Sequence, residues 1–184
     1  MSAFQSIIQK YTKVANQLAE DRLANAMLMA ADAHALVAER IQETGVDANG
    51  DKMETYSENL MPYWLLNESN FSSPSKIRRF KKNADKGKNN GSYSALRKAY
   101  GLPTDKRTLS FDGNMWKSII PVLERHDDKV TIVVLKARDE ENQDKVNWNS
   151  ASLGINILAF SESERQLLNS FNRERITKLI NKNN

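Results

Sequence analysis

LSFDGNMWKSI, residues 109–119, opens the stretch of sequence that decides the fold. Its Asp112-Gly113 pair suits a tight turn, because glycine adopts positive φ without steric cost and apolar residues stand on both sides of the pair. Residues 130–135 follow as a mostly β-branched run, which is typical of a buried or half-buried strand. Residues 155–160 form a further apolar segment. Together these segments predict a small antiparallel sheet between residues 108 and 160.

Length and composition describe one domain with a modest core. The chain has 184 residues, of which 40% are hydrophobic, and its mean hydropathy is −0.63. No apolar run approaches the roughly 20 residues that a membrane helix requires, and the amphipathic N-terminus does not fit a signal peptide. The absence of cysteine excludes a disulfide framework and thiolate metal ligands. We therefore expect a protein that is made in the cytoplasm and has no membrane partner.

Positive charge is concentrated in the middle of the chain. The net charge is only +4, yet residues 76–107 contain eleven basic and two acidic side chains. This distribution is typical of an electrostatic face rather than of a uniformly basic protein, and a solvated charged loop is the alternative interpretation. The candidate patch, facing nucleic acid or a partner protein, consists of Lys76, Arg78, Arg79, Lys81, Lys82, Lys86, Lys88, Arg97 and Lys98.

The first 45 residues carry the pattern of a long amphipathic helix. Apolar residues recur at steps of three and four, and alanine is dense around residues 24–38. At about 1.5 Å per residue the helix would span on the order of 60 Å and overhang a small sheet, so its far end must bury against something else, such as a second subunit. Two shorter helices with a break near Glu20-Asp21 are the alternative. Gly45 suits the left-handed cap that ends the helix.

The predicted oligomer interface combines apolar positions of this helix with an aromatic cluster that follows it. The cluster lies in residues 56–66, and aromatic side chains beside leucine and methionine more often fill a core or an interface than stack on bases. The predicted interface residues are Val14, Leu18, Met27, Val37, Tyr63 and Trp64.

The acidic turn that begins at Asp47 resembles a calcium-binding loop in its spacing. Asp47, Asn49 and Asp51 take the places of the first ligands of such a loop. Lys52, however, occupies the position that requires glycine, and Glu54 replaces the expected apolar residue. We therefore predict a structural turn.

The remaining segments complete a single α+β domain, in which a small antiparallel sheet is flanked by a long N-terminal helix and a C-terminal helix. Within it, residues 76–82 suit a short basic helix, and polar residues 137–152 suit a loop or an extended hairpin. Ser161 and Glu164 form a capping box at the start of the last helix. Residues 1–184 thus divide into a helix (1–45), a basic variable insert (67–107), the sheet core (108–160) and a closing helix (161–181).

No group of residues in the sequence suggests catalysis. The two histidines, His34 and His126, stand alone, outside any metal-ligand spacing. Residues 86–91 are rich in lysine and glycine, but they lack the preceding strand and the Lys-Ser/Thr ending of a phosphate-binding loop. We therefore expect no enzymatic activity and no cofactor or metal ion.

Three local patterns follow one another along the chain. The first is the turn from Asp47 to Gly50, followed by Tyr56-Ser57; the second is the stretch 109–119; the third is LAFSESE, residues 158–164. In this order, with a basic variable insert between them, the patterns resemble the virion-morphogenesis or tail-completion proteins of tailed bacteriophages. The resemblance spans most of the chain.

That resemblance implies a structural virion protein with a small antiparallel sheet flanked by helices, repeated in a ring at the junction of portal and tail. It implies a homo-oligomer, portal and tail proteins as partners, a location in the neck or tail region of the virion, and no catalysis. Tail completion protein, head-tail connector and another neck component all remain open. The basic segment would line the channel for genomic DNA, or pair with acidic faces of the portal or of the next subunit.

The alternative function is that of a non-catalytic nucleic-acid-binding protein. In that case residues 76–107 contact phosphates, and Tyr63 and Trp64 serve as stacking platforms. The two functions differ in what the purified protein would do. A connector would form a closed oligomer that is indifferent to DNA, whereas a nucleic-acid binder would bind DNA with an affinity that falls steeply with salt.

Overall fold

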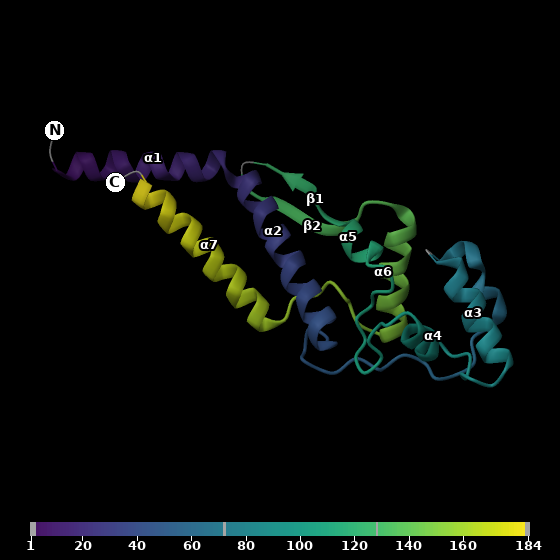
Figure 1. Ribbon diagram of the computed structural model, residues 1–184. Helices are drawn as coiled ribbons and strands as arrows, with labels where there is room; N and C mark the ends of the chain where they lie inside the picture. The colour runs from purple at the N-terminus through teal and green to yellow at the C-terminus, as the bar shows by residue number, and fades with distance from the viewer. Residues whose placement is uncertain (1–2, 72, 128, 183–184) are drawn as a thin grey trace.

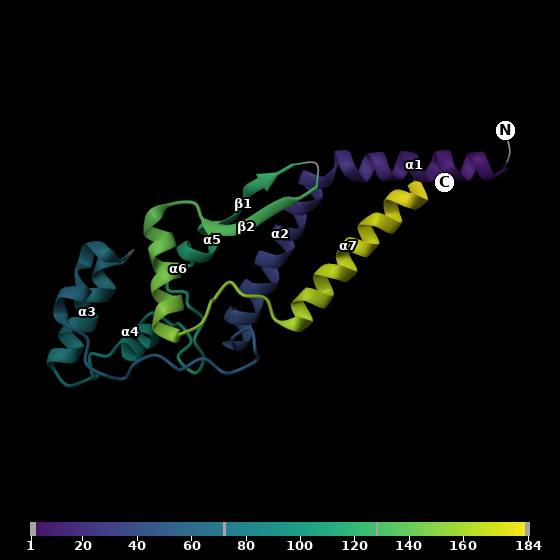
Figure 2. The same ribbon diagram turned by 180° about the vertical axis from the view of Figure 1, so that it is seen from behind.

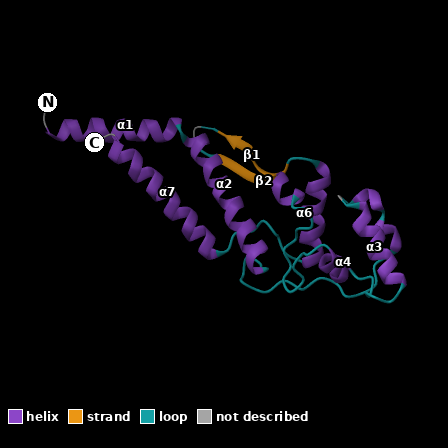
Figure 3. Ribbon diagram, viewed as in Figure 1, coloured by secondary structure: helices purple, strands orange, loops and turns teal. Residues whose placement is uncertain are grey.

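The computed structural model describes residues 3–71, 73–127 and 129–182. In these residues helices dominate and a single two-stranded antiparallel sheet is present, which confirms the α+β class with a small sheet (Figures 1 and 3). The elements are α1 (Ala3–Glu20), α2 (Arg22–Glu39), α3 (Pro74–Asp85), α4 (Tyr93–Ala99), α5 (Asn114–Ser118), β1 (Ile119–His126), β2 (Thr131–Ala137), α6 (Glu140–Leu153) and α7 (Glu162–Lys182).

The N-terminal helical region is broken at Asp21, as the two-helix alternative predicts. Asp21 accepts a hydrogen bond from the Gln17 side-chain amide at 3.0 Å, and the chain changes direction there, so that α1 and α2 diverge (Figure 1). After α2 a π-helical turn, Arg40–Thr44, leads to Gly45 at φ 68°, the predicted left-handed cap. A Cβ at Gly45 would lie 2.9 Å from Cβ of Lys106, so close packing also requires glycine here.

The sheet is a hairpin whose second strand matches the predicted β-branched run. Val122 pairs with Val134, and a bulge lies between Leu123 and Arg125. At the turn, Oδ1 of Asp127 accepts the backbone N–H groups of Lys129 and Val130 at 2.9 and 2.8 Å. Because the sheet has two strands, both strands are edges, and β1 accommodates Pro121.

Of the other two strand predictions in this stretch, the one that follows the Asp112-Gly113 turn is correct only from Ile119 onward, and the one at residues 155–160 is wrong. Gly113 does form a turn, at φ 79°, but residues 114–118 continue as the short helix α5 rather than as a strand. Residues 155–160 contain a turn in which Oδ1 of Asn156 accepts the backbone N–H of Leu158 at 3.0 Å. Ile157 is nevertheless buried, so this apolar segment fills the core from a turn.

The predicted polar loop at 137–152 is also wrong, because most of it forms α6. Asp139 caps the helix by accepting the backbone N–H of Asn142 at 2.9 Å, and Gly154 at φ 65° ends it. Most of the helix faces solvent, which explains its polar composition, and Val146 is its buried contact with the core.

Helix α2 is the centre of the main core. It packs against both strands on one side and against α7 on the other, an arrangement that is visible from both directions (Figures 1 and 2). The main core consists of Val37, Ile41, Met53, Leu109, Met115, Trp116, Ile119, Val146 and Ile157. Inside it, the Trp116 indole N–H donates to the carbonyl oxygen of Thr108 at 3.3 Å, which satisfies the buried donor.

A second, smaller core holds the insert together. Leu66, Ile77, Phe80 and Leu96 are buried against one another, with aromatic side chains packed around them. These residues come from a 3₁₀ turn (Tyr63–Leu66), α3 and α4, which lie at the end of the molecule opposite to α1 (Figure 1). We refer to residues 63–100 as the insert lobe.

Helix α7 begins in the predicted capping box. Oγ of Ser161 accepts the backbone N–H of Glu164 at 3.2 Å, and Glu164 Oε2 accepts the Ser161 N–H at 2.7 Å. The same carboxylate pairs with Arg40 Nε at 2.8 Å. Farther along, Arg175 pairs with Asp32 of α2, and both ends of the chain then lie at the same end of the molecule (Figure 1).

Replacing Arg40 by methionine should lower the free energy of unfolding by about 3 kcal/mol, because the buried carboxylate of Glu164 would lose its cation. Urea denaturation measures the change. Arg165→Met, on the exposed side of α7, is the matched control and should alter the free energy by less than about 0.5 kcal/mol. Equal effects of the two substitutions would contradict this assignment.

Candidate functional site

Exposed apolar side chains gather on the N-terminal half of α1. Ile7, Ile8 and Tyr11 are 52%, 49% and 59% exposed, although they continue the apolar spacing of the helix. This half of α1 projects away from the sheet and the insert lobe (Figures 1 and 2). We call these three residues the apolar arm. They belong to the sequence pattern that predicted the helix, but were not among the predicted interface residues.

The predicted interface residues lie in different environments. Val14 and Val37 are buried within this chain, so the prediction that they contact a second subunit is wrong. Leu18 and Met27 are half-buried. Trp64 is 75% exposed in the insert lobe, which lies at the end of the molecule opposite to α1 (Figure 1). The side chain of Tyr63 lies outside the described part of the structure.

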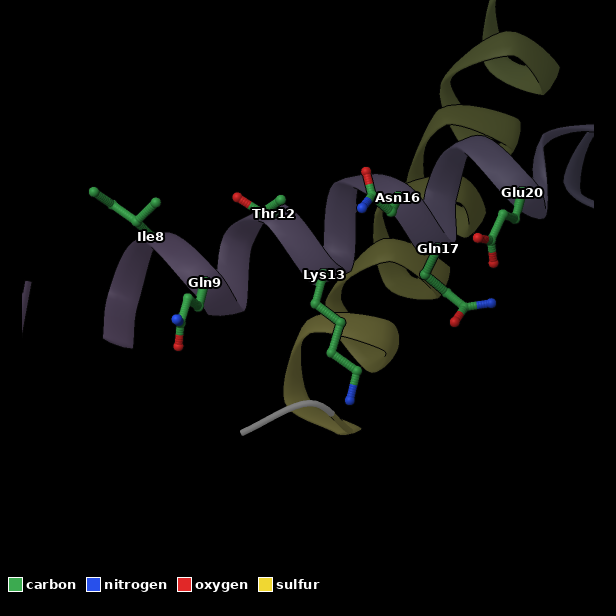
Figure 4. A pocket seen from close by; sticks show the side chains of 7 residues that line it. All are labelled: Ile8, Gln9, Thr12, Lys13, Asn16, Gln17 and Glu20. Carbon is green, nitrogen blue, oxygen red and sulfur yellow. The ribbon is translucent and has the colours of Figure 1, made fainter. Parts of the chain in front are cut away.

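A shallow depression follows α1 beside the apolar arm (Figure 4). Ile8, Gln9, Thr12, Lys13, Asn16, Gln17 and Glu20 line it. In the close view Ile8, Thr12 and Asn16 point to one side of the helix and Gln9, Lys13 and Gln17 to the other, with α7 behind. Because one helix supplies all the lining residues and they are mostly polar, the depression has the character of an open surface rather than of a substrate cleft.

The Asp47 loop is the structural turn that its sequence predicts. Oδ1 of Asp47 accepts the backbone N–H groups of Asn49 and Asp51 at 2.8 and 2.9 Å, so the carboxylate is already engaged by its own loop. Among the described residues, no three histidine, aspartate or glutamate side chains gather as metal ligands.

Both histidines have structural neighbours. The ring of His34 stacks on Trp116 with centroids 6.4 Å apart, and burial lowers its pKa below the usual value. Nδ1 of His126 lies 2.8 Å from the Thr131 hydroxyl at the end of the hairpin. His34 therefore lies on α2 against the main core, and His126 lies at the end of β1.

The basic residues of α3 lie on its solvent side. At about 100° per residue, Arg78, Arg79 and Lys82 are opposite to the buried Ile77 and Phe80. All three cations are exposed. The predicted short basic helix at 76–82 is therefore present, and it directs three of its cations away from the lobe core.

The other predicted basic residues divide into exposed and buried groups. Lys76 is exposed, with Nζ 5.1 Å from the ring centre of Tyr100, and Lys86, Lys88 and Lys98 are exposed as well. Lys81 is half-buried. Arg97 is wrongly assigned to the patch, because it is only 1% exposed.

Arg97 is a structural cation inside the insert lobe. Its Nε donates to the carbonyl oxygen of Pro103 at 2.9 Å, Nη1 to that of Ser110 at 2.6 Å, and Nη2 to the Thr108 hydroxyl at 3.1 Å. Its guanidinium also lies 3.9 Å from the ring centre of Tyr56. Three segments of chain are thereby joined around one side chain, which no local sequence pattern indicates.

Burial and hydrogen bonding shift the pKa of two groups at helix α4. Burial raises the pKa of the Tyr93 hydroxyl above its usual value. Hydrogen bonds from the side chains of Ser94 and Asn90 lower the pKa of Glu58, which keeps this carboxylate charged. The shift at Tyr93 therefore reflects packing of the lobe, and the shift at Glu58 reflects its hydrogen bonds.

No family model, no curated protein and no solved structure matches this chain. Within the described residues, no helix has both the length and the apolar character needed to cross a membrane.

Replacing Arg97 by glutamine should lower the free energy of unfolding by about 3 kcal/mol. The reason is that two carbonyl oxygens and one hydroxyl oxygen would lose their charged hydrogen-bond donor. The neighbouring Lys98 is exposed, so Lys98→Gln removes the same charge and should change the free energy by less than about 0.5 kcal/mol. Thermal and urea denaturation compare the two variants. A tolerated Arg97→Gln substitution would contradict the structural role.

Proposed function

We propose that this protein is a structural component that acts by assembling with other protein subunits. The observation that carries the proposal is the apolar arm, in which three large apolar side chains of α1 are about half exposed. Large apolar groups that project together from the body of a molecule mark an interaction site more often than isolated surface residues do. The resemblance of three sequence patterns to tail-completion proteins supports a place at the head-tail junction of a tailed phage.

The position of the arm supports assembly through repeated contacts. α1 is braced by α2 and by the end of α7, and Val14 is buried there, whereas Ile7, Ile8 and Tyr11 are exposed nearer the N-terminus. Full burial of an isoleucine or tyrosine side chain contributes roughly 1.5–3 kcal/mol, so burial of the exposed half of each would contribute appreciably to association.

The arm and the insert lobe lie at opposite ends of an elongated molecule (Figure 1). If the arm of one subunit contacts a different surface of the next, the contact is head-to-tail and closes into a ring when the rotation between subunits permits. Such a ring agrees with the proposed role as a tail completion protein, head-tail connector or other neck component, with portal and tail proteins as neighbours in the virion.

Native mass spectrometry of the purified protein tests this proposal. We expect a closed oligomer of defined order for the wild type. The variant Ile7→Ser/Tyr11→Ser should be monomeric, because it removes two of the three arm side chains. Gln9→Ser/Asn16→Ser, on the same helix, should assemble as the wild type does. Circular dichroism verifies that both variants retain their helices.

A wild-type protein that is monomeric at every concentration, both alone and with added portal protein, would contradict the proposal. So would an arm variant that assembles as well as its control. The first result would leave nucleic-acid binding through the basic residues as the better function, and the second would place the assembly surface outside the arm.

A further inference from the structure

The strongest charged feature of the molecule is the outer face of the insert lobe. Residues 74–88 contain seven basic side chains and one acidic side chain, a net charge of +6 in fifteen residues. The lobe core fixes α3 through Ile77 and Phe80, so its basic residues are displayed on a folded helix rather than on a loose loop. We call Arg78, Arg79, Lys82 and Lys86 the basic face.

The cations of the basic face are open to solvent. Arg78 pairs with Glu68 at 3.3 Å, and both side chains of this pair are solvent-exposed. Arg79, Lys82 and Lys86 have exposed side chains. Since exposed ion pairs contribute little, Arg78 is also free to exchange Glu68 for an external anion.

The segment after α3 is held in place, so that the basic face extends beyond the helix end. The backbone N–H of Lys88 donates to the carbonyl oxygen of Asn83 at 2.8 Å, and that of Gly87 to Ala84 at 2.9 Å. The side-chain amide of Asn89 donates to the carbonyl oxygen of Phe80 at 3.3 Å. Lys86 is therefore presented from an ordered turn directly after Lys82.

From these observations we infer that the basic face binds the phosphate backbone of duplex DNA. Arginine and lysine exposed on one side of a helix match closely spaced phosphates, and guanidinium groups bind phosphate oxygens in a bidentate manner. The apolar residues of α3 are buried in the lobe core, so the helix lacks the exposed apolar side with which an amphipathic helix enters a membrane surface. The inference does not depend on the arm, which lies at the other end of the molecule.

Phosphate contacts without base contacts have a measurable signature. Each contact releases counterions, so the logarithm of affinity falls with the logarithm of salt concentration by roughly 0.9 per phosphate. With four contacts, raising salt from about 50 to about 200 mM should weaken binding about 100-fold. Binding should also be insensitive to base sequence, since phosphate contacts carry no sequence information.

The test is fluorescence anisotropy with a labelled duplex of about 20 base pairs and arbitrary sequence, over the same salt range. In the variant Arg78→Gln/Arg79→Gln/Lys82→Gln, about one contact remains, so the loss of affinity should shrink to about fourfold. The control Lys117→Gln/Lys129→Gln/Lys178→Gln removes equal charge from exposed positions outside the lobe and should retain the wild-type salt dependence.

A second variant, Arg78→Lys/Arg79→Lys, keeps the charge and should keep most of the salt dependence, which separates loss of charge from loss of fold. Equal salt dependence of the triple variant and its control would overturn the inference, as would salt-insensitive binding. Equal competition by polyglutamate would assign the face to an acidic protein instead. Tighter binding of a single strand, lost in Trp64→Ala, would also overturn the duplex assignment.

If the protein assembles through the arm but fails these DNA measurements, only the inference of DNA binding is overturned. If the protein binds DNA as described but stays monomeric, only the proposed assembly is overturned. The two experiments therefore fail independently.

Discussion

The structure depends most on the buried ion pair between Arg40 and Glu164. Arg40 ends the central helix, and its two remaining nitrogens donate to the carbonyl oxygens of Val46 and Ala159 at 2.9 and 2.8 Å. Glu164 in turn completes the capping box of α7. One guanidinium therefore joins the end of α2, the loop after it and the start of the last helix. Because both charges are buried, each is destabilising without the other. The ion pair therefore fixes the position at which α7 begins.

That junction determines which surfaces are left for partners. α2 is occupied on one side by the hairpin and on the other by α7, so its residues Ala30, Ala33 and Val37 are buried within the chain, whereas Leu28 is 52% exposed. α7 then reaches α1, where Val14 is buried, but Ile7, Ile8 and Tyr11 stay exposed. At the other end, the insert lobe has its own core and directs α3 cations outward. The chain thus has a packed middle and two different ends, one apolar and one basic.

The sequence correctly predicts those elements that depend on residues close together in the chain. The β-branched residues of β2, the cap at Gly45, the capping box at Ser161 and the basic helix α3 are all found where the sequence indicates them. Gly113 was recognised as a turn, but a turn at positive φ precedes a helix as readily as a strand, so α5 was missed. α6 was missed because a helix with one buried contact, Val146, carries almost no apolar periodicity. Arg97 was misassigned because its acceptors, Pro103, Thr108 and Ser110, converge on it only in the folded lobe.

The most informative measurement is amide hydrogen exchange along α1 at low and high protein concentration. It tests whether the apolar arm is an assembly surface. Amide exchange is fast in an exposed helix end, and burial of that end in an interface slows the exchange. We expect the amides around Ile7 and Tyr11 to become protected as concentration rises, while those of Met27 and Val37 in α2 stay unchanged. Equal exchange around Ile7 and Tyr11 at both concentrations, in a protein whose mass shows that it has assembled, would contradict the claim and place the interface elsewhere.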